Sequence, residues 1–133
     1  MFRIALIALG GGGGSVLRYL VQGWVQAAAQ RLGMRPFPLG TLLVNISGCF
    51  AIGFLATLFA GPRMIREDYR FAIITGILGG YTTFSSFSWE SNQLANEREF
   101  LLASVNVGVS VVVGLIATWL GRELVVSLYG TTA

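Results

Sequence analysis

Residues 76–90 read GILGGYTTFSSFSWE and place tyrosine, threonine and serine hydroxyls inside an otherwise apolar region. The stretch has no charged residue before its last position. Two adjacent glycines, Gly79 and Gly80, stand before two β-branched residues, Thr82 and Thr83. Paired glycines followed by β-branched residues favour a break in a helix. The stretch therefore predicts a helix that is interrupted between Gly79 and Thr83.

The composition of the whole chain identifies its class. Hydrophobic residues make up 54% of the 133 positions and charged residues only 11%, whereas a soluble domain carries about 25% charged residues. We therefore predict an integral membrane protein. The sequence has no histidine and a single cysteine, Cys49, and only Glu90 among six acidic residues lies within reach of an apolar segment. An enzyme would lack its acid, base and nucleophile, so we predict no enzymatic activity.

The positive charge of the chain does not indicate a nucleic-acid partner. Nine arginines and no lysine give a net charge of +3. The arginines are scattered along the chain, whereas a nucleic-acid site needs them gathered in one patch. We therefore expect membrane lipid, and no nucleic acid, around this protein.

Charged residues divide the chain into four apolar segments, which we interpret as one transmembrane domain over residues 1–133. Each segment reaches the ~20 residues that a membrane helix needs, and a single helix satisfies its own backbone in lipid. The centre of the third segment falls near Thr82, so we predict that this helix is broken at mid-membrane. The predicted fold class is all-α, with four transmembrane helices at residues 4–29, 38–59, 71–94 and 100–120.

The arginines also bear on orientation, because four spans place both termini on the same side. Leaving aside Arg18 within the first span, the other eight divide five to three between the two sides, which is a weak bias under the positive-inside rule. This count leaves open insertion in both orientations, or a single orientation with both termini in the cytoplasm. The five are Arg3, Arg63, Arg66, Arg70 and Arg122, and the three are Arg31, Arg35 and Arg98.

Polar residues recur every four positions in the second and fourth segments. Thr41 and Asn45 share one helix face. Small residues and hydroxyls are common where membrane helices pack, but an asparagine in hydrocarbon is costly unless it meets a partner or water. The stripes fit either helix packing or a pore lining, and the asparagines favour a pore. The stripe of the fourth segment consists of Asn106, Ser110, Gly114 and Thr118.

The first segment carries five successive glycines, Gly10 to Gly14, followed by Arg18. Glycines in lipid allow two helices to approach closely, so we predict a close helix contact there. Arg18 has two interpretations. Its side chain either extends to the lipid headgroups, or it supplies positive potential to an aqueous vestibule.

Two phenylalanines, Phe84 and Phe87, follow the predicted break at a spacing of three. Such a pair alone is ordinary helix core. Here it adjoins uncharged hydroxyl donors, and the edges of aromatic rings carry partial positive charge. No ring of acidic residues is present to attract a cation. This lining suits a small anion better than a cation.

Three motifs resemble those of the Fluc family of small bacterial fluoride channels, and the resemblance covers essentially the whole chain. They are GGGGSVLRY at Gly11–Tyr19, GTLLVNISGCF at Gly40–Phe50 and GILGGYTTFSSFSWE at Gly76–Glu90. The resemblance implies an antiparallel, dual-topology homodimer in the bacterial inner membrane. Two separate pores would pass F⁻ passively out of the cytoplasm, where entry as HF otherwise traps the ion.

The resemblance also implies roles for single residues. The fluoride pore is lined by two phenylalanines whose ring edges face the anion, by one asparagine and by hydroxyls of several spans. Carried over by position, these residues are Phe84, Phe87, Asn45, Ser110, Thr41 and Thr83.

The break in the third span carries a second implied site. Gly79 and Thr82 match the positions whose backbone carbonyls, from both subunits, hold a buried structural Na⁺. Arg18 and Glu90 are candidates for a vestibule, and the sequence leaves their roles open. Asn106 departs from the tyrosine or hydroxyl residue that the family pattern places at its position.

Two other functions remain open from the sequence. A proton-coupled exporter of the small multidrug type also has four short spans and dual topology, but it needs a carboxylate in the first span, where this chain has Arg18. A non-conducting membrane assembly protein would use the polar stripes for packing alone. That alternative predicts that Asn45→Ala weakens the dimer without affecting ion flux.

Overall fold

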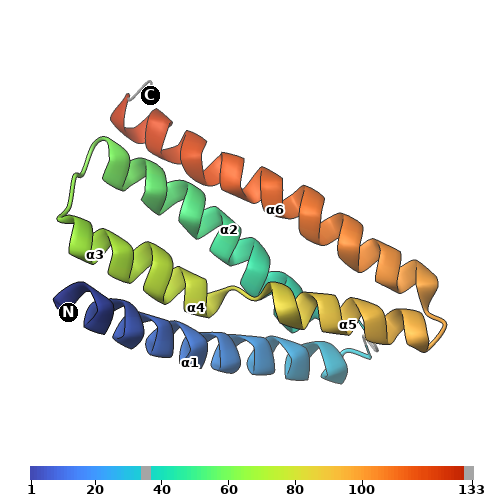
Figure 1. Ribbon diagram of the computed structural model, residues 1–133. Coiled ribbons are helices and arrows are strands. Elements are labelled where there is room, and N and C mark those ends of the chain that lie inside the picture. The colour runs from blue at the N-terminus through green and yellow to red at the C-terminus, as the bar shows by residue number, and fades with distance from the viewer. Residues whose placement is uncertain (34–36, 131–133) are drawn as a thin grey trace.

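The computed structural model describes residues 1–33 and 37–130, and these ranges contain helices and no strand. Figure 1 shows the helices as long rods, with the beginning of α1 and the end of α6 at the same end of the bundle. The elements in chain order are α1 (Phe2–Arg31), α2 (Leu39–Ala60), α3 (Glu67–Phe71), the π-helix η1 (Ala72–Leu78), α4 (Gly79–Tyr81), α5 (Phe84–Asn96) and α6 (Phe100–Tyr129).

Within residues 1–33 and 37–130, three helices are long and apolar enough to cross a membrane, namely α1, α2 and α6. This finding confirms the all-helical, multi-span prediction at that level. Helix α6 begins at Phe100 as predicted and continues beyond residue 120 to Tyr129. Arg35, which entered the count of arginines on each side, lies outside the described residues.

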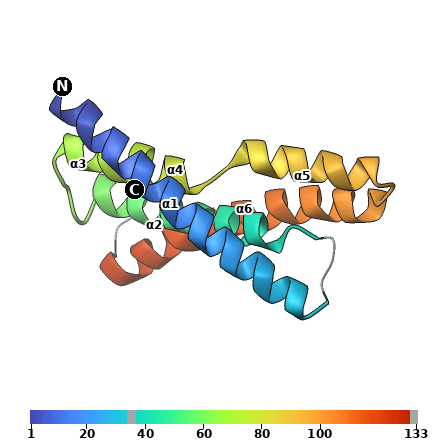
Figure 2. The same cartoon turned by 90° about the horizontal axis from the view of Figure 1, so that it is seen from below.

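The third predicted span is a helix in two parts. Residues 67–81 form one continuous helical stretch of α3, η1 and α4, and α5 continues after a break. The two parts have different neighbours. The first part packs along α1 and the second along α6, and Figure 2 shows α5 set apart from α4 by an extended link.

The break lies at Thr82 and Thr83, within the stretch from Gly79 to Thr83 where the sequence predicts it, and the paired glycines themselves are not the residues that leave the helix. Thr82 (φ −81°, ψ 157°) and Thr83 (φ −152°, ψ 109°) are extended, while Gly79 and Gly80 remain helical. The reason is packing. A Cβ at Gly80 would lie 3.0 Å from the Cα of Gly11, so this glycine serves to bring α4 against α1.

The glycine run of α1 forms the close contact that the sequence predicts. A Cβ at Gly10 would lie 2.6 Å from the carbonyl oxygen of Ala72, and one at Gly14 would lie 3.0 Å from the backbone nitrogen of Tyr81. A Cβ at Gly12 or Gly13 would meet none of the described atoms of another element within 4 Å. The contact therefore uses the glycines one helical turn apart, which share one face of α1.

Helices α2 and α6 form the most extensive contact between two helices. Glycines again allow it: a Cβ at Gly53 would meet the backbone of Thr118, and one at Gly121 would lie 2.8 Å from the backbone nitrogen of Phe54. Val44 of α2 and Val125 of α6 are both fully buried. This rigid pair carries the polar stripes of both helices.

We expect Gly121→Ala to destabilise the protein because the added methyl group would push α6 away from α2. Overpacking of this kind costs about 1–3 kcal/mol. The midpoint of thermal unfolding in detergent should fall. Gly108→Ala on the same helix is the matched control, since nothing lies within 4 Å of that position. Equal midpoints for the two variants would contradict the packing described here.

Candidate functional site

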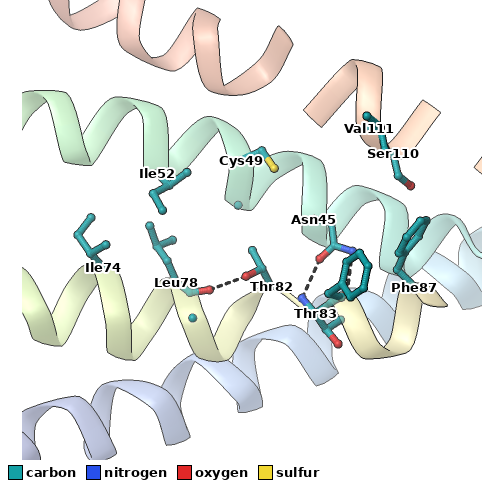
Figure 3. Close-up of a pocket in the computed structure, with 13 residues that line it drawn as sticks. Asn45, Cys49, Ile52, Ile74, Leu78, Thr82, Thr83, Phe87, Ser110 and Val111 are labelled. Carbon is teal, nitrogen blue, oxygen red and sulfur yellow. Dashed lines mark hydrogen bonds between the residues drawn. The ribbon is translucent and has the colours of Figure 1, made fainter. Parts of the chain in front are cut away.

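A cavity of about 380 Å³ lies beside the break, between α2, η1, α5 and α6. Figure 3 shows its side chains converging from these helices. It brings together most of the predicted site residues. They are Asn45, Gly79, Thr82, Thr83, Phe84, Phe87 and Ser110, with Gly48, Cys49, Ile52, Ile74, Leu78 and Val111 as further lining.

Asn45 of α2 holds the break in place. Its Nδ2 donates to the carbonyl oxygen of Thr83 at 3.0 Å, and its Oδ1 accepts from the backbone nitrogen of Thr83 at 2.8 Å. Both backbone groups of an extended residue are thereby paired, as a low-dielectric environment requires. An amide nitrogen carries two protons, so one N–H of Asn45 remains for another partner.

Thr83 begins α5 as its N-cap. Its hydroxyl accepts from the backbone nitrogen of Ser86 at 3.2 Å and donates to Ser86 Oγ at 3.0 Å. The residue is 6% exposed. Its side chain thus satisfies the first turn of the helix that carries Phe84 and Phe87, which gives it a role in positioning the phenylalanines.

Phe84 and Phe87 both line the cavity. Their ring centroids are 5.5 Å apart and their planes meet at 51°. Phe87 is partly buried, whereas Phe84 is 78% exposed in the single chain. The cavity wall at Phe84 is therefore open on the side away from this chain.

Ser110 of α6 lies across the cavity from Asn45. Its hydroxyl oxygen is buried and has no hydrogen-bond partner among the described residues. In Figure 3 the hydroxyl is directed towards the ring of Phe87. A buried hydroxyl without a partner costs free energy, so this group is available to a ligand in the cavity.

The chemistry of the cavity follows from these groups. No charged residue is among those that line it. It offers an amide N–H from Asn45, a hydroxyl from Ser110 and the edges of aromatic rings, all of which carry partial positive charge. Such groups can replace part of the water shell of a small anion without binding it as tightly as an arginine would.

Thr41 and Glu90 form a separate polar cluster outside this cavity. The Thr41 hydroxyl donates to Glu90 Oε1 at 2.6 Å, and Gln22 Nε2 donates to Thr41 Oγ1 at 3.0 Å. Glu90 Oε2 is buried with no partner among the described residues. Thr41 thus lies one turn from Asn45 on α2 but faces different neighbours.

Gln22 is not among the site residues predicted from the sequence, although the spacing of polar residues on α1 indicates it. Arg18, Gln22 and Gln26 recur every four residues on α1, the same spacing that drew attention to the second and fourth segments. Gln26 accepts from the backbone nitrogen of Gly40 at 3.1 Å and donates to the carbonyl oxygen of Phe37 at 3.2 Å. This polar stripe ties α1 to the beginning of α2.

Arg18 reaches the break and does not line the cavity. Its Nη1 donates to the carbonyl oxygen of Thr82 at 3.4 Å, and the side chain is partly buried. The contact pairs a backbone carbonyl that the break leaves without a helical partner. The residue therefore contributes to the break, in addition to its positive charge.

The backbone at the break offers carbonyl oxygens that a cation could use. Because the N–H of Thr83 donates to Asn45, the carbonyl of Gly79 loses its α-helical partner. Gly79 is exposed, with nothing near its Cβ position. The described residues hold no group of histidine, cysteine or acidic side chains suited to a metal. Neutral carbonyls fit a monovalent ion, and Arg18 competes for the oxygen of Thr82.

Comparisons with known proteins cover nearly the whole chain. Residues 5–122 match the family model described as CrcB-like protein, Camphor Resistance (CrcB). A fluoride-specific ion channel FluC of Solibacter usitatus is 48% identical, over 92% of this chain and 97% of the relative. Proteins of the same name from Geobacter metallireducens and Trichlorobacter lovleyi are 45% and 43% identical, over 91% and 96% of this chain and 94% and 99% of theirs. The chain belongs to the CrcB-like family.

Proposed function

We propose that the protein is a fluoride channel that passes F⁻ passively out of the cytoplasm and so relieves fluoride toxicity. The observation that carries the proposal is the uncharged cavity in which a phenylalanine pair meets the free hydroxyl of Ser110. The relatives named fluoride-specific ion channels support the choice of ion.

The proposed pathway replaces water with weak donors. A fluoride ion entering the cavity exchanges part of its hydration shell for the amide of Asn45, the hydroxyl of Ser110 and the ring edges of Phe84 and Phe87. Each of these interactions is moderate. Moderate binding lets the ion leave again, which conduction requires. The flow needs no energy source beyond the gradient of the ion itself.

We further propose a fourth membrane crossing and a homodimer. Residues 67–96 span the same 30 positions in length as α1 and α6, so the two-part helix is long enough to cross a bacterial inner membrane. The 78% exposure of Phe84 leaves the cavity wall incomplete in one chain. A second, antiparallel copy would cover it, and the dimer would then have two pores. The two subunits would insert into the membrane in opposite orientations, which is dual topology.

The same dimer would hold a structural Na⁺ on the carbonyls of Gly79 and Thr82 from both subunits. The free carbonyl of Gly79 supports this proposal. We expect protein purified without Na⁺ and reconstituted with K⁺ as the counter-ion for the ionophore to lose fluoride efflux, and added Na⁺, but not added N-methylglucamine, to restore it. Efflux that is unchanged without Na⁺ would remove the cation from the proposal.

The test of the function is ion efflux from liposomes that contain the purified protein. Liposomes loaded with F⁻ should empty rapidly after a potassium ionophore is added, and liposomes loaded with Cl⁻ should not. Equal rates for the two ions, or no fluoride efflux, would exclude a fluoride-selective channel. Protein-free liposomes provide the background leak.

The two alternatives make different predictions. A small-multidrug-type exporter would accumulate a cationic drug in response to a pH gradient, and α1 carries no acidic residue to couple that transport. A non-conducting assembly protein would show no efflux of either ion. The liposome experiment separates both from the channel.

A further inference from the structure

Asn106 is a buried polar residue that the proposed pathway does not use. It is 1% exposed and ranks among the largest fully buried side chains. Its Nδ2 donates to Ser91 Oγ of α5 at 2.9 Å. The Ser91 hydroxyl donates in turn to the carbonyl oxygen of Phe87 at 2.8 Å. The proton of Ser91 is thus committed, and its oxygen is free to accept from Asn106.

The position of this bond matters because α5 and α6 run antiparallel (Figure 1). Ser91 lies one turn after Phe87 on α5, and Asn106 lies one turn before Ser110 on α6. The bonded pair Ser91–Asn106 therefore lies one helical turn along the α5–α6 interface from the pair Phe87–Ser110. Among the described residues it is the one side-chain hydrogen bond between these two helices.

Helix α5 has little else to fix its distance from α6. Leu94 is its single buried side chain, and it lies further from the cavity than Ser91 does. The Asn45 contact holds the beginning of α5 through Thr83. Between these two points, Glu90 bonds to Thr41 of α2, and the Ser91–Asn106 bond is the polar contact with α6.

We propose that Asn106 is a positioning residue that, through Ser91, sets the separation between the Phe87 ring and the Ser110 hydroxyl. This inference rests on the proposed fluoride channel and adds a determinant of its throughput and selectivity. The bond acts on the geometry of the pore and not on the ion. Removal of either partner should therefore have the same effect.

The experiment compares Ser91→Ala and Asn106→Leu with the unmodified protein in fluoride and chloride efflux, normalised to assembled protein from gel filtration. One hydrogen bond is equivalent to about a three- to tenfold change in an equilibrium, and we expect fluoride efflux per channel to fall by about that factor. The ratio of fluoride to chloride efflux should fall too, which a loss of folded protein would not change. Ser104→Ala, at an exposed position of α6, is the matched control and should retain the full rate.

Two further variants keep the result decisive. Ser91→Thr retains the hydroxyl and should keep the rate of the unmodified protein. The double variant Ser91→Asn, Asn106→Ser swaps the two partners and should recover part of the rate, because the hydrogen bond can form in the opposite direction. If Asn106→Leu lowers efflux and Ser91→Ala does not, Asn106 contacts the ion itself and the positioning role is wrong. Unchanged efflux in both variants would also overturn it, while absent efflux in the unmodified protein would overturn the proposed function as well.

Discussion

Replacement of Phe87 or Phe84 by isoleucine should nearly abolish fluoride efflux and leave assembly intact. Isoleucine has a similar hydrophobic character but no ring edge, so the partial positive charge that faces the anion disappears. The two rings also contact each other, so either variant removes one edge from the ion and disturbs the placement of the other ring. We expect efflux to fall at least about tenfold for each variant.

The measurement is fluoride efflux per assembled protein, with the elution volume on gel filtration as the record of assembly. Phe100→Ile is the matched control, because that ring is 63% exposed and does not line the cavity. Full efflux from either pore variant would mean that ring edges do not conduct the ion. Loss of assembly together with efflux would instead favour a packing role for the phenylalanine pair.

The second large effect is expected at Asn45. Asn45→Leu removes both hydrogen bonds to Thr83 and leaves a backbone N–H and a carbonyl unpaired in an apolar surrounding. Each unpaired group costs about 1–3 kcal/mol. The variant should therefore lose thermal stability and fluoride efflux together, as measured by unfolding in detergent and by liposome efflux.

Asn45→Asp tests the sign of the charge that the cavity accepts. The carboxylate still accepts from the N–H of Thr83 but cannot donate to the carbonyl oxygen of Thr83, and its charge lies unpaired in an apolar surrounding, so stability should fall as well. A negative charge in the cavity repels the anion, so efflux should stay low. Asn92→Leu, at an exposed position of α5, is the control for both variants. Fluoride efflux that survives Asn45→Asp would place the ion path away from Asn45.

The sequence predicts best those features of the fold that depend only on the composition and spacing of residues within one segment. The length and apolar character of α1, α2 and α6 follow from charge-free segments, and the interruption of the third segment follows from its local residue types. The interruption lies within the predicted stretch from Gly79 to Thr83, but which of these residues leave the helix did not follow from the local sequence. Gly79 and Gly80 favour a break in isolation, but the contact of Gly80 with α1 outweighs that preference, and a tertiary contact is absent from local sequence.

The site shows the same division. Residue types indicated an uncharged, anion-compatible lining before any contact was known. The partners of each residue depend on how the helices are rotated against one another, which the spacing within one helix does not determine. Thr41 was therefore grouped with Asn45 although it bonds to Glu90, and Asn106 was placed on a polar stripe without its partner Ser91.

The two-part third helix has a consequence for how this protein can evolve. Its first part is fixed against α1 through backbone contacts at glycines, where almost any substitution is harmful. Its second part meets α6 through a few side chains, where one exchange alters one contact. The extended link at Thr82–Thr83 separates the part that packs on α1 from the part that packs on α6. Selection can therefore adjust the half that carries the phenylalanines while inheriting the other half unchanged.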